Sequence, residues 1–126
     1  MTKMQALNSF LSGFGLPAYE ENSIYSSSAI PSFPYITYSV SFGNIYGNDA
    51  PLTASIWYRT LSWQAIEQKA DEISAYLGMQ GKVIQCDDGY IWIKRGSPFA
   101  QTMGDSTDDL VKRILINLSV TYYTTV

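Results

Sequence analysis

Alternation of apolar and polar residues over positions 113–123 is the feature that most constrains how this chain can fold. An apolar residue at every second position is the period of a β-strand, whose successive side chains point to opposite faces of a sheet. A strand of this length belongs near the middle of a sheet. Its second face is neutral and rich in hydroxyl groups, which predicts that this face is also covered. The apolar side comprises Ile114, Ile116, Leu118, Val120 and Tyr122, and the other side Arg113, Leu115, Asn117, Ser119, Thr121 and Tyr123.

Two earlier runs, at residues 36–42 and 52–59, alternate in the same way. Pro31 and Pro34 favour extended backbone just before the first of them. The connection over residues 43–50 is rich in turn-forming residues, so the two runs are predicted to pair as a hairpin.

A second hairpin is predicted around Asp87-Asp88-Gly89, because Asp-Gly between apolar runs favours a tight turn. Residues 96–105, which follow, are less regular. Pro98 confines any strand there to the edge of a sheet. We expect this segment to be a short edge strand or an ordered loop.

Two other segments, residues 2–14 and 62–77, show the spacing of a helix. Their apolar residues recur every three or four positions and therefore lie on one face. Thr2 and Ser62 are suited to cap the helix starts, and glycines past the last apolar residue favour an end there. The stretch 18–32 has no period and is predicted to be a loop. The two apolar faces are Met4, Leu7, Leu11 and Phe14, and Trp63, Ile66, Ala70, Ile73 and Leu77.

The order of these elements predicts an α+β fold. It consists of a mainly antiparallel sheet of four to five strands with two helices packed on one face. A chain of 126 residues has the size of a single domain, so we expect one hydrophobic core within residues 1–126. Such a core needs no disulfide or metal for stability. The lone Cys86 is then a small packed hydrophobe, as expected in a reduced, cytosolic setting.

Residue types that catalysis needs are scarce. The chain has no histidine, the commonest general base near neutral pH and the commonest metal ligand. Its glycines form no phosphate-binding loop, and its acidic clusters lie in predicted turns, where Asp fits the turn geometry. We therefore expect no enzymatic activity, no cofactor and no metal. A small enzyme or ligand-binding protein that uses carboxylates or backbone groups is the alternative.

Charge and composition limit the partners. Eight Lys and Arg against 11 Asp and Glu give a net charge of −3, which disfavours binding through many phosphate contacts. No run of about 18 apolar residues occurs, so we expect neither a membrane span nor an export signal. Charged residues make up 15% of the chain and aromatic residues 14%. Few charges and many Tyr and Trp are typical of protein interfaces, although a sheet-rich core also recruits aromatic residues.

The segment 90–105 has a mixture of aromatic residues, arginine and methionine that is typical of protein-binding surfaces. Alternatively, Trp92 and Phe99 belong to the core, and Lys94 and Arg95 are solubilising residues at a strand edge. We predict a subunit or partner interface that comprises Tyr46, Trp57, Trp92, Lys94, Arg95, Phe99, Gln101 and Met103.

Taken in their order along nearly the whole chain, these segments resemble the tail-terminator proteins of long-tailed bacteriophages, also called minor tail or tail-completion proteins. No single motif is specific to this family. The resemblance lies in the order in which the structural patterns follow one another along the chain. The matching segments are Phe33-Pro34-Tyr35-Ile36, Ile56-Trp57-Tyr58, the helical residues 63–77, the residues 91–101 that read IWIKRGSPFAQ, and the closing strand 115–123.

The resemblance implies a structural virion protein of the phage tail that is assembled in the host cytoplasm. Such a protein forms a ring of identical subunits, usually a hexamer, on the growing end of the tail tube and stops its polymerisation. Its partners are then the tail tube protein, a neck or head-completion protein and, if the tail is contractile, the sheath. DNA is only passing cargo, and an acidic ring would not hold it. The alternative within the same class is another head–tail connector or a tail-tube ring protein.

Overall fold

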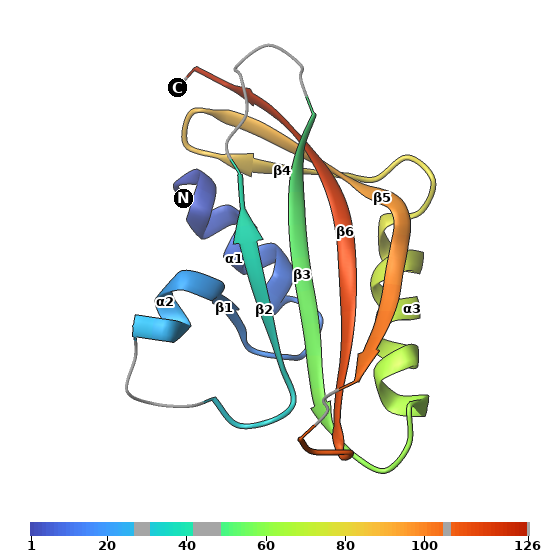
Figure 1. Ribbon diagram of the computed structural model, residues 1–126. Coiled ribbons are helices and arrows are strands. Elements are labelled where there is room, and N and C mark those ends of the chain that lie inside the picture. The colour runs from blue at the N-terminus through green and yellow to red at the C-terminus, as the bar shows by residue number, and fades with distance from the viewer. Residues whose placement is uncertain (27–30, 42–48, 105–106, 126) are drawn as a thin grey trace.

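A computed structural model describes residues 1–26, 31–41, 49–104 and 107–125, and these form a curled sheet with the helices α1 and α3 on one side (Figure 1). The α+β class is as predicted. The described residues form six strands and three helices, where four to five strands and two helices were expected. The elements are α1 (Lys3–Ser12), β1 (Ala18–Glu20), α2 (Glu21–Ser26), β2 (Tyr35–Val40), β3 (Asp49–Arg59), α3 (Gln64–Leu77), β4 (Lys82–Cys86), β5 (Gly89–Gly104) and β6 (Val111–Thr124).

Strand β6 lies in the middle of the sheet, as its length and alternation predicted. The strand order is β1-β2-β3-β6-β5-β4, so β6 has β3 on one side and β5 on the other. Every pair is antiparallel except β1 with β2. Both predicted hairpins are confirmed: β2 pairs with β3, and β4 pairs with β5 across a two-residue turn, with Cys86 opposite Gly89. The connection 43–48 lies outside the described residues.

The prediction of a loop over residues 18–32 is wrong for its first part. Ala18 pairs with Ile36 in the parallel β1–β2 ladder, and the Ile36 N–H donates to the Pro17 carbonyl at 2.8 Å. Helix α2 follows directly, with the Glu20 carboxylate accepting the Ser23 N–H at 3.0 Å. A strand of three residues is too short to show alternation, so composition alone favoured a loop.

The segment 96–105 also differs from its prediction, because β5 continues to Gly104 instead of ending as a short strand. The β5–β6 register shifts between Arg95 and Ala100, and pairing with β6 resumes at Ala100. Pro98 lies inside this bulge, where the ladder is already interrupted. Strand β4 pairs with β5 only as far as Ile93. The expected edge is therefore present, but it is the second half of a long strand.

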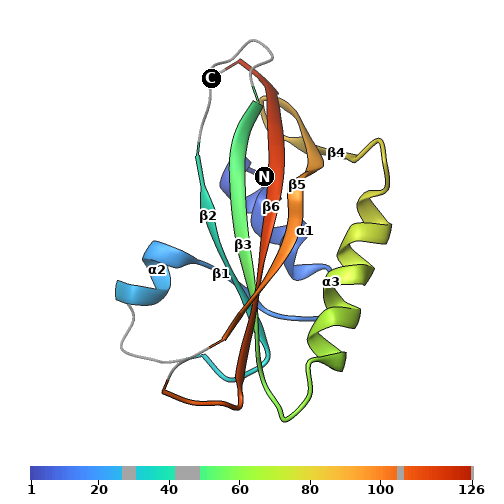
Figure 2. The same ribbon diagram turned by 45° about the vertical axis from the view of Figure 1, so that its right-hand side comes forward.

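Helices α1 and α3 pack on the same face of the sheet, as predicted (Figure 2). Thr2 caps α1 in a reciprocal box: its hydroxyl accepts the Gln5 N–H at 3.2 Å, and its own N–H donates to the Gln5 side chain at 2.9 Å. The predicted cap at Ser62 is wrong, because Trp63 is the N-cap of α3 and its side chain makes no capping hydrogen bond. Ser62 lies one position earlier, and its hydroxyl accepts the Gln64 N–H at 3.0 Å. Gly78 ends that helix with a φ of 62°.

Apolar side chains from both helices and one sheet face form a single core. Burying each large one stabilises the fold by about 1.5–3 kcal/mol. Cys86 is buried, as expected, whereas Met4 is 43% exposed and does not belong to the apolar stripe of the first helix. The most buried large side chains are Leu7, Leu11, Ile36, Leu52, Ile56, Ile66, Ile73, Leu77, Ile91, Ile93, Ile116 and Val120.

The other face of the sheet is open in the single chain. Its residues on β6, from Arg113 to Ser119, are half-buried, and neither α1 nor α3 lies over them. The cover predicted for this face is therefore not provided by α1 or α3. The face has many small hydroxyl side chains, and it also has aromatic ones.

Candidate protein-binding face

A row of large side chains crosses the open face of the sheet. The register places Tyr35 opposite Trp57, Trp57 opposite Arg113, and Arg113 opposite Met103. These four residues come from β2, β3, β6 and β5 in turn, and each is half-buried. We call them the aromatic row. They are direct neighbours because cross-strand partners on one face lie about 4.5–5.5 Å apart at Cβ.

Contacts on both sides of Trp57 fix the geometry of the row. The Tyr35 and Trp57 rings stack with their centroids 6.1 Å apart and an interplanar angle of 17°. The Arg113 guanidinium lies 4.9 Å from the centre of the Trp57 ring. The indole N–H donates to the Thr37 hydroxyl at 2.9 Å, and Arg113 Nε donates to the Ser55 hydroxyl at 3.0 Å. A cation–π contact at a half-exposed site adds about 0.5–1 kcal/mol.

Two more aromatic residues extend the row toward the β1 end of the sheet. The Tyr19 ring centroid lies 6.3 Å from that of Tyr35, and the Phe33 centroid lies 5.2 Å from it. Tyr19 and Phe33 are each 37% exposed. The aromatic surface therefore continues beyond the row to the edge of the sheet.

A second cluster lies on the same open face, where β3, β6 and β5 run side by side. Lys94 Nζ donates to the Asp49 carboxylate and to the Thr121 hydroxyl, both at 2.9 Å, and lies 4.2 Å from the Trp92 ring centre. The Thr121 hydroxyl also donates to Asp49. Hydrogen bonds from Thr121 and Lys94 hold the pKa of Asp49 below its usual range. Trp92 Nε1 donates to the Gln80 carbonyl at 2.7 Å, which fixes the indole.

The structure brings most of the predicted interface residues to this face. Trp57 and Met103 lie in the aromatic row, Trp92 and Lys94 lie in the second cluster, and Gln101 pairs with Leu115 between them.

The remaining predicted residues lie elsewhere. Arg95 points to the helix side, where its Nη1 donates to the Ser74 hydroxyl of α3 at 3.0 Å. Phe99 is half-buried against the core. Tyr46 lies outside the described residues. The sequence reasoning did not include Tyr35 and Arg113, which the strand register places on either side of Trp57.

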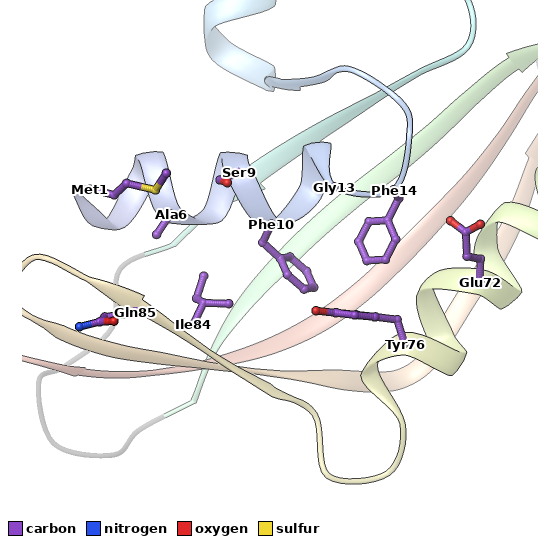
Figure 3. A pocket seen from close by; sticks show the side chains of 10 residues that line it. All are labelled: Met1, Ala6, Ser9, Phe10, Gly13, Phe14, Glu72, Tyr76, Ile84 and Gln85. Atoms are coloured by element: carbon purple, nitrogen blue, oxygen red, sulfur yellow. The ribbon is translucent and has the colours of Figure 1, made fainter.

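A cleft of about 640 Å³ opens on the helix side, between α1, α3 and β4 (Figure 3). Phe10, Phe14 and Tyr76 point toward one another there, with ring centroids 5.4–6.1 Å apart. The only carboxylate among its lining residues is Glu72, which pairs with Lys69 at 3.1 Å. The cleft is aromatic and provides no acid–base pair.

The described part of the chain offers no sign of a reactive or metal-binding site. No buried side-chain nitrogen or oxygen among these residues lacks a hydrogen-bond partner. No group of three or more acidic or cysteine side chains in the described ranges is placed to hold a metal ion. None of the described helices is both long and apolar enough to cross a bilayer. The open face therefore stands out by its half-buried and exposed aromatic side chains and not by reactive groups.

Comparison with known proteins gives no match, whether to protein-family models, to curated proteins or to solved structures. What the protein does must be inferred from its own residues.

Proposed function

We propose that this protein is a tail terminator: a structural virion protein that forms a ring, a hexamer, on the end of a phage tail tube and ends its polymerisation. The resemblance of the chain to that family is the starting point. The observation that carries the proposal is the open sheet face with its aromatic row. Aromatic residues, arginine and methionine are the types enriched in protein interfaces and in their energetic centres.

The size and rigidity of this face support a protein partner. Four strands about 4.8 Å apart and about eight residues long cover a projected area on the order of 500 Å². Side chains that protrude from the sheet add to this area. Stable interfaces bury about 800 Å² per partner. Stacking and hydrogen bonds already hold Trp57 in place, so it loses little conformational freedom on binding. The face is thus large enough, and ordered enough, to form most of one subunit contact.

A closed ring with head-to-tail contacts needs two different surfaces on each subunit, and the first surface of one subunit must bind the second surface of the next. The open face of the sheet and the helix-covered side are two such surfaces. The two ends of the ring are then left for the tail tube on one side and the neck or head on the other, with the sheath around it if the tail contracts. In this proposal the ring is assembled in the host cytoplasm and becomes part of the virion tail, with DNA passing through it.

Light scattering coupled to size-exclusion chromatography tests the proposal directly. We expect a discrete hexamer, or a monomer that forms rings when a tail tube protein from the same source is added. Electron microscopy of tube assembly should then show tubes that stop growing once the ring is bound. An obligate dimer, or tubes whose growth is unchanged, would refute the terminator role. Long tubes formed by this chain alone would instead identify it as a tail-tube ring protein.

A pair of methionine substitutions separates assembly from folding. Met103→Glu places a charge in the aromatic row, whereas Met79→Glu makes the same change at a site that is 95% exposed after α3. We expect both variants to fold, as judged by circular dichroism, and only Met103→Glu to lose the ring. Phe99→Glu is expected to destabilise the monomer, because Phe99 packs against the core. A Met103→Glu protein that still forms hexamers would exclude the row from the subunit interface.

A further inference from the structure

We propose that the aromatic row of one subunit packs against the side of α3 that borders β5 in the next subunit, with Arg113 placed against Glu67 and Asp71. This inference rests on the ring proposed above and names the two surfaces that form its subunit contact. It commits the open sheet face to a second copy of this chain.

Among the described cations on the open face, Arg113 is the one that forms no ion pair with a described carboxylate. Arg59 pairs with Asp108 at 3.2 Å, and Lys94 pairs with Asp49 at 2.9 Å. Arg113 instead donates one hydrogen bond to the Ser55 hydroxyl and lies over an indole ring. A guanidinium has five N–H donors, and within the described residues no carboxylate lies within 4.0 Å of this one. The face therefore presents a positive charge that has hydrogen-bonding capacity left.

The side of α3 that borders β5 presents the opposite charge. Glu67 and Asp71 are exposed and are one turn apart, and neither forms an ion pair with another described residue. Like charges four residues apart destabilise a helix by about 0.2–0.5 kcal/mol, which a nearby cation would relieve. The one lysine of the helix, Lys69, already pairs with Glu72 and donates to the Phe14 carbonyl at 2.6 Å. The negative charge at residues 67 and 71 is thus not compensated by the helix itself.

These two carboxylate residues line a hollow that has room for a side-chain head group. The hollow lies between α3 and the second half of β5 and also includes Gln101 and Thr102. Its volume is about 140 Å³, equal to about four to five water molecules. Beside it, β5 has no β4 partner beyond Ile93, so the hollow opens at an uncovered edge of the sheet.

The two surfaces cannot meet within one chain, because α3 packs on the face of the sheet opposite to the aromatic row (Figure 2). A contact between them must join different copies, and it leaves one copy with an unused α3 surface and the other with an unused aromatic row. Such head-to-tail contacts close into a ring when the rotation between copies permits. Opposite charges on the two surfaces would also select the correct register and disfavour face-to-face dimers.

Single-stranded nucleic acid is the other occupant that an aromatic sheet face with cations could take, since bases stack on such platforms. The charges favour a second copy instead. Two of the three cations on this face are paired with carboxylates, and the chain has a net charge of −3. Binding to the phosphate backbone needs several free cations along the strand.

Charge exchange between the two surfaces tests the inference. We expect Arg113→Glu alone and the pair Glu67→Lys with Asp71→Lys to weaken the hexamer at least about tenfold in dissociation concentration. The three substitutions together should restore it, because the charges are then exchanged across the contact. Lys82→Glu, the same charge change on exposed β4, is the control and should leave the hexamer intact. Circular dichroism and urea midpoints confirm that each variant is folded.

Each contrary outcome has a separate meaning. Single variants that form hexamers as well as wild type, while Met103→Glu does not, would overturn the α3 contact and leave the ring proposal standing. A combined variant that stays dissociated would also refute the pairing. A wild-type protein that forms no ring, alone or with the tube protein, would remove the proposed function itself. Binding of a fluorescent oligo(dT) strand that is lost in Arg113→Glu would reassign the face to nucleic acid.

Discussion

We predict that Gly89→Ala destabilises the protein by about 2–4 kcal/mol. Gly89 follows the turn of the β4–β5 hairpin with a φ of 150°, and a Cβ added there would lie 2.0 Å from the Tyr123 carbonyl oxygen. Strained backbone costs about 1–3 kcal/mol, and overfilling a packed site costs about 1–3 kcal/mol. The two contributions overlap, because one shift of β5 away from β6 relieves part of each. The shift would also move Trp92 and Lys94, which lie further along the same strand.

Urea denaturation followed by tryptophan fluorescence measures this loss. A denaturant slope of about 2 kcal/mol per molar turns it into a fall of about 1–2 M in the unfolding midpoint. Gly104→Ala is the matched control at the other end of β5, because no described atom lies within 4 Å of its added Cβ. We expect that variant to stay within about 0.5 kcal/mol of wild type. If Gly89→Ala were as stable as Gly104→Ala, the close approach of β5 to β6 at this position would be wrong.

Three further predictions concern single groups. Thr2→Ala removes the capping box of α1 and should lower the free energy of unfolding by about 1 kcal/mol, measured in the same urea assay; an unchanged midpoint would contradict the cap. Burial raises the pKa of Tyr122 from 10.0 to about 12, so its neutral form contributes stability that is complete below pH 10 and is lost as the pH rises through about 12. Tyr122→Phe should flatten the decline of the urea midpoint in that window, and an equally steep decline in this variant would assign it to other groups. Burial, followed by the hydrogen bond to Asp88, raises the pKa of the Cys86 thiol, so a chromogenic disulfide reagent should label it slowly in the folded protein and rapidly in urea; rapid labelling of the folded protein would show that the thiol is accessible.

The sequence predicted those elements whose pattern repeats over several turns or residue pairs. Strand β6 alternates over its whole length and was placed correctly in the middle of the sheet. The helix cap at Thr2 was also recognised, because capping depends on side chains only two or three residues away. The predicted cap at Ser62 was wrong by one position, because Trp63 is the N-cap of α3. The hairpin turn at Asp87 and Asp88 is local in the same sense.

Features that depend on distant pairing were not predictable in this way. Strand β1 is too short to show a period and exists because β2 pairs with it. The bulge around Pro98 interrupts the alternation of β5, so the second half of this strand has the sequence pattern of an irregular segment. The aromatic row needs the register of four strands, so Trp57 and Met103 were named without Arg113 between them. Only the three-dimensional pairing reveals that these side chains are neighbours.

The position of β6 also has a consequence for biosynthesis. It follows the other strands of the described residues, yet it joins β3 to β5 and so holds the two halves of the sheet together. While β6 is still within the ribosome, the emerging chain has two unpaired strand edges and an incomplete core. Exposed edges and apolar surface of this kind promote aggregation of nascent chains. Rapid emergence of β6 after β5, or a chaperone that shields β3 and β5 until then, would favour productive folding in the cell.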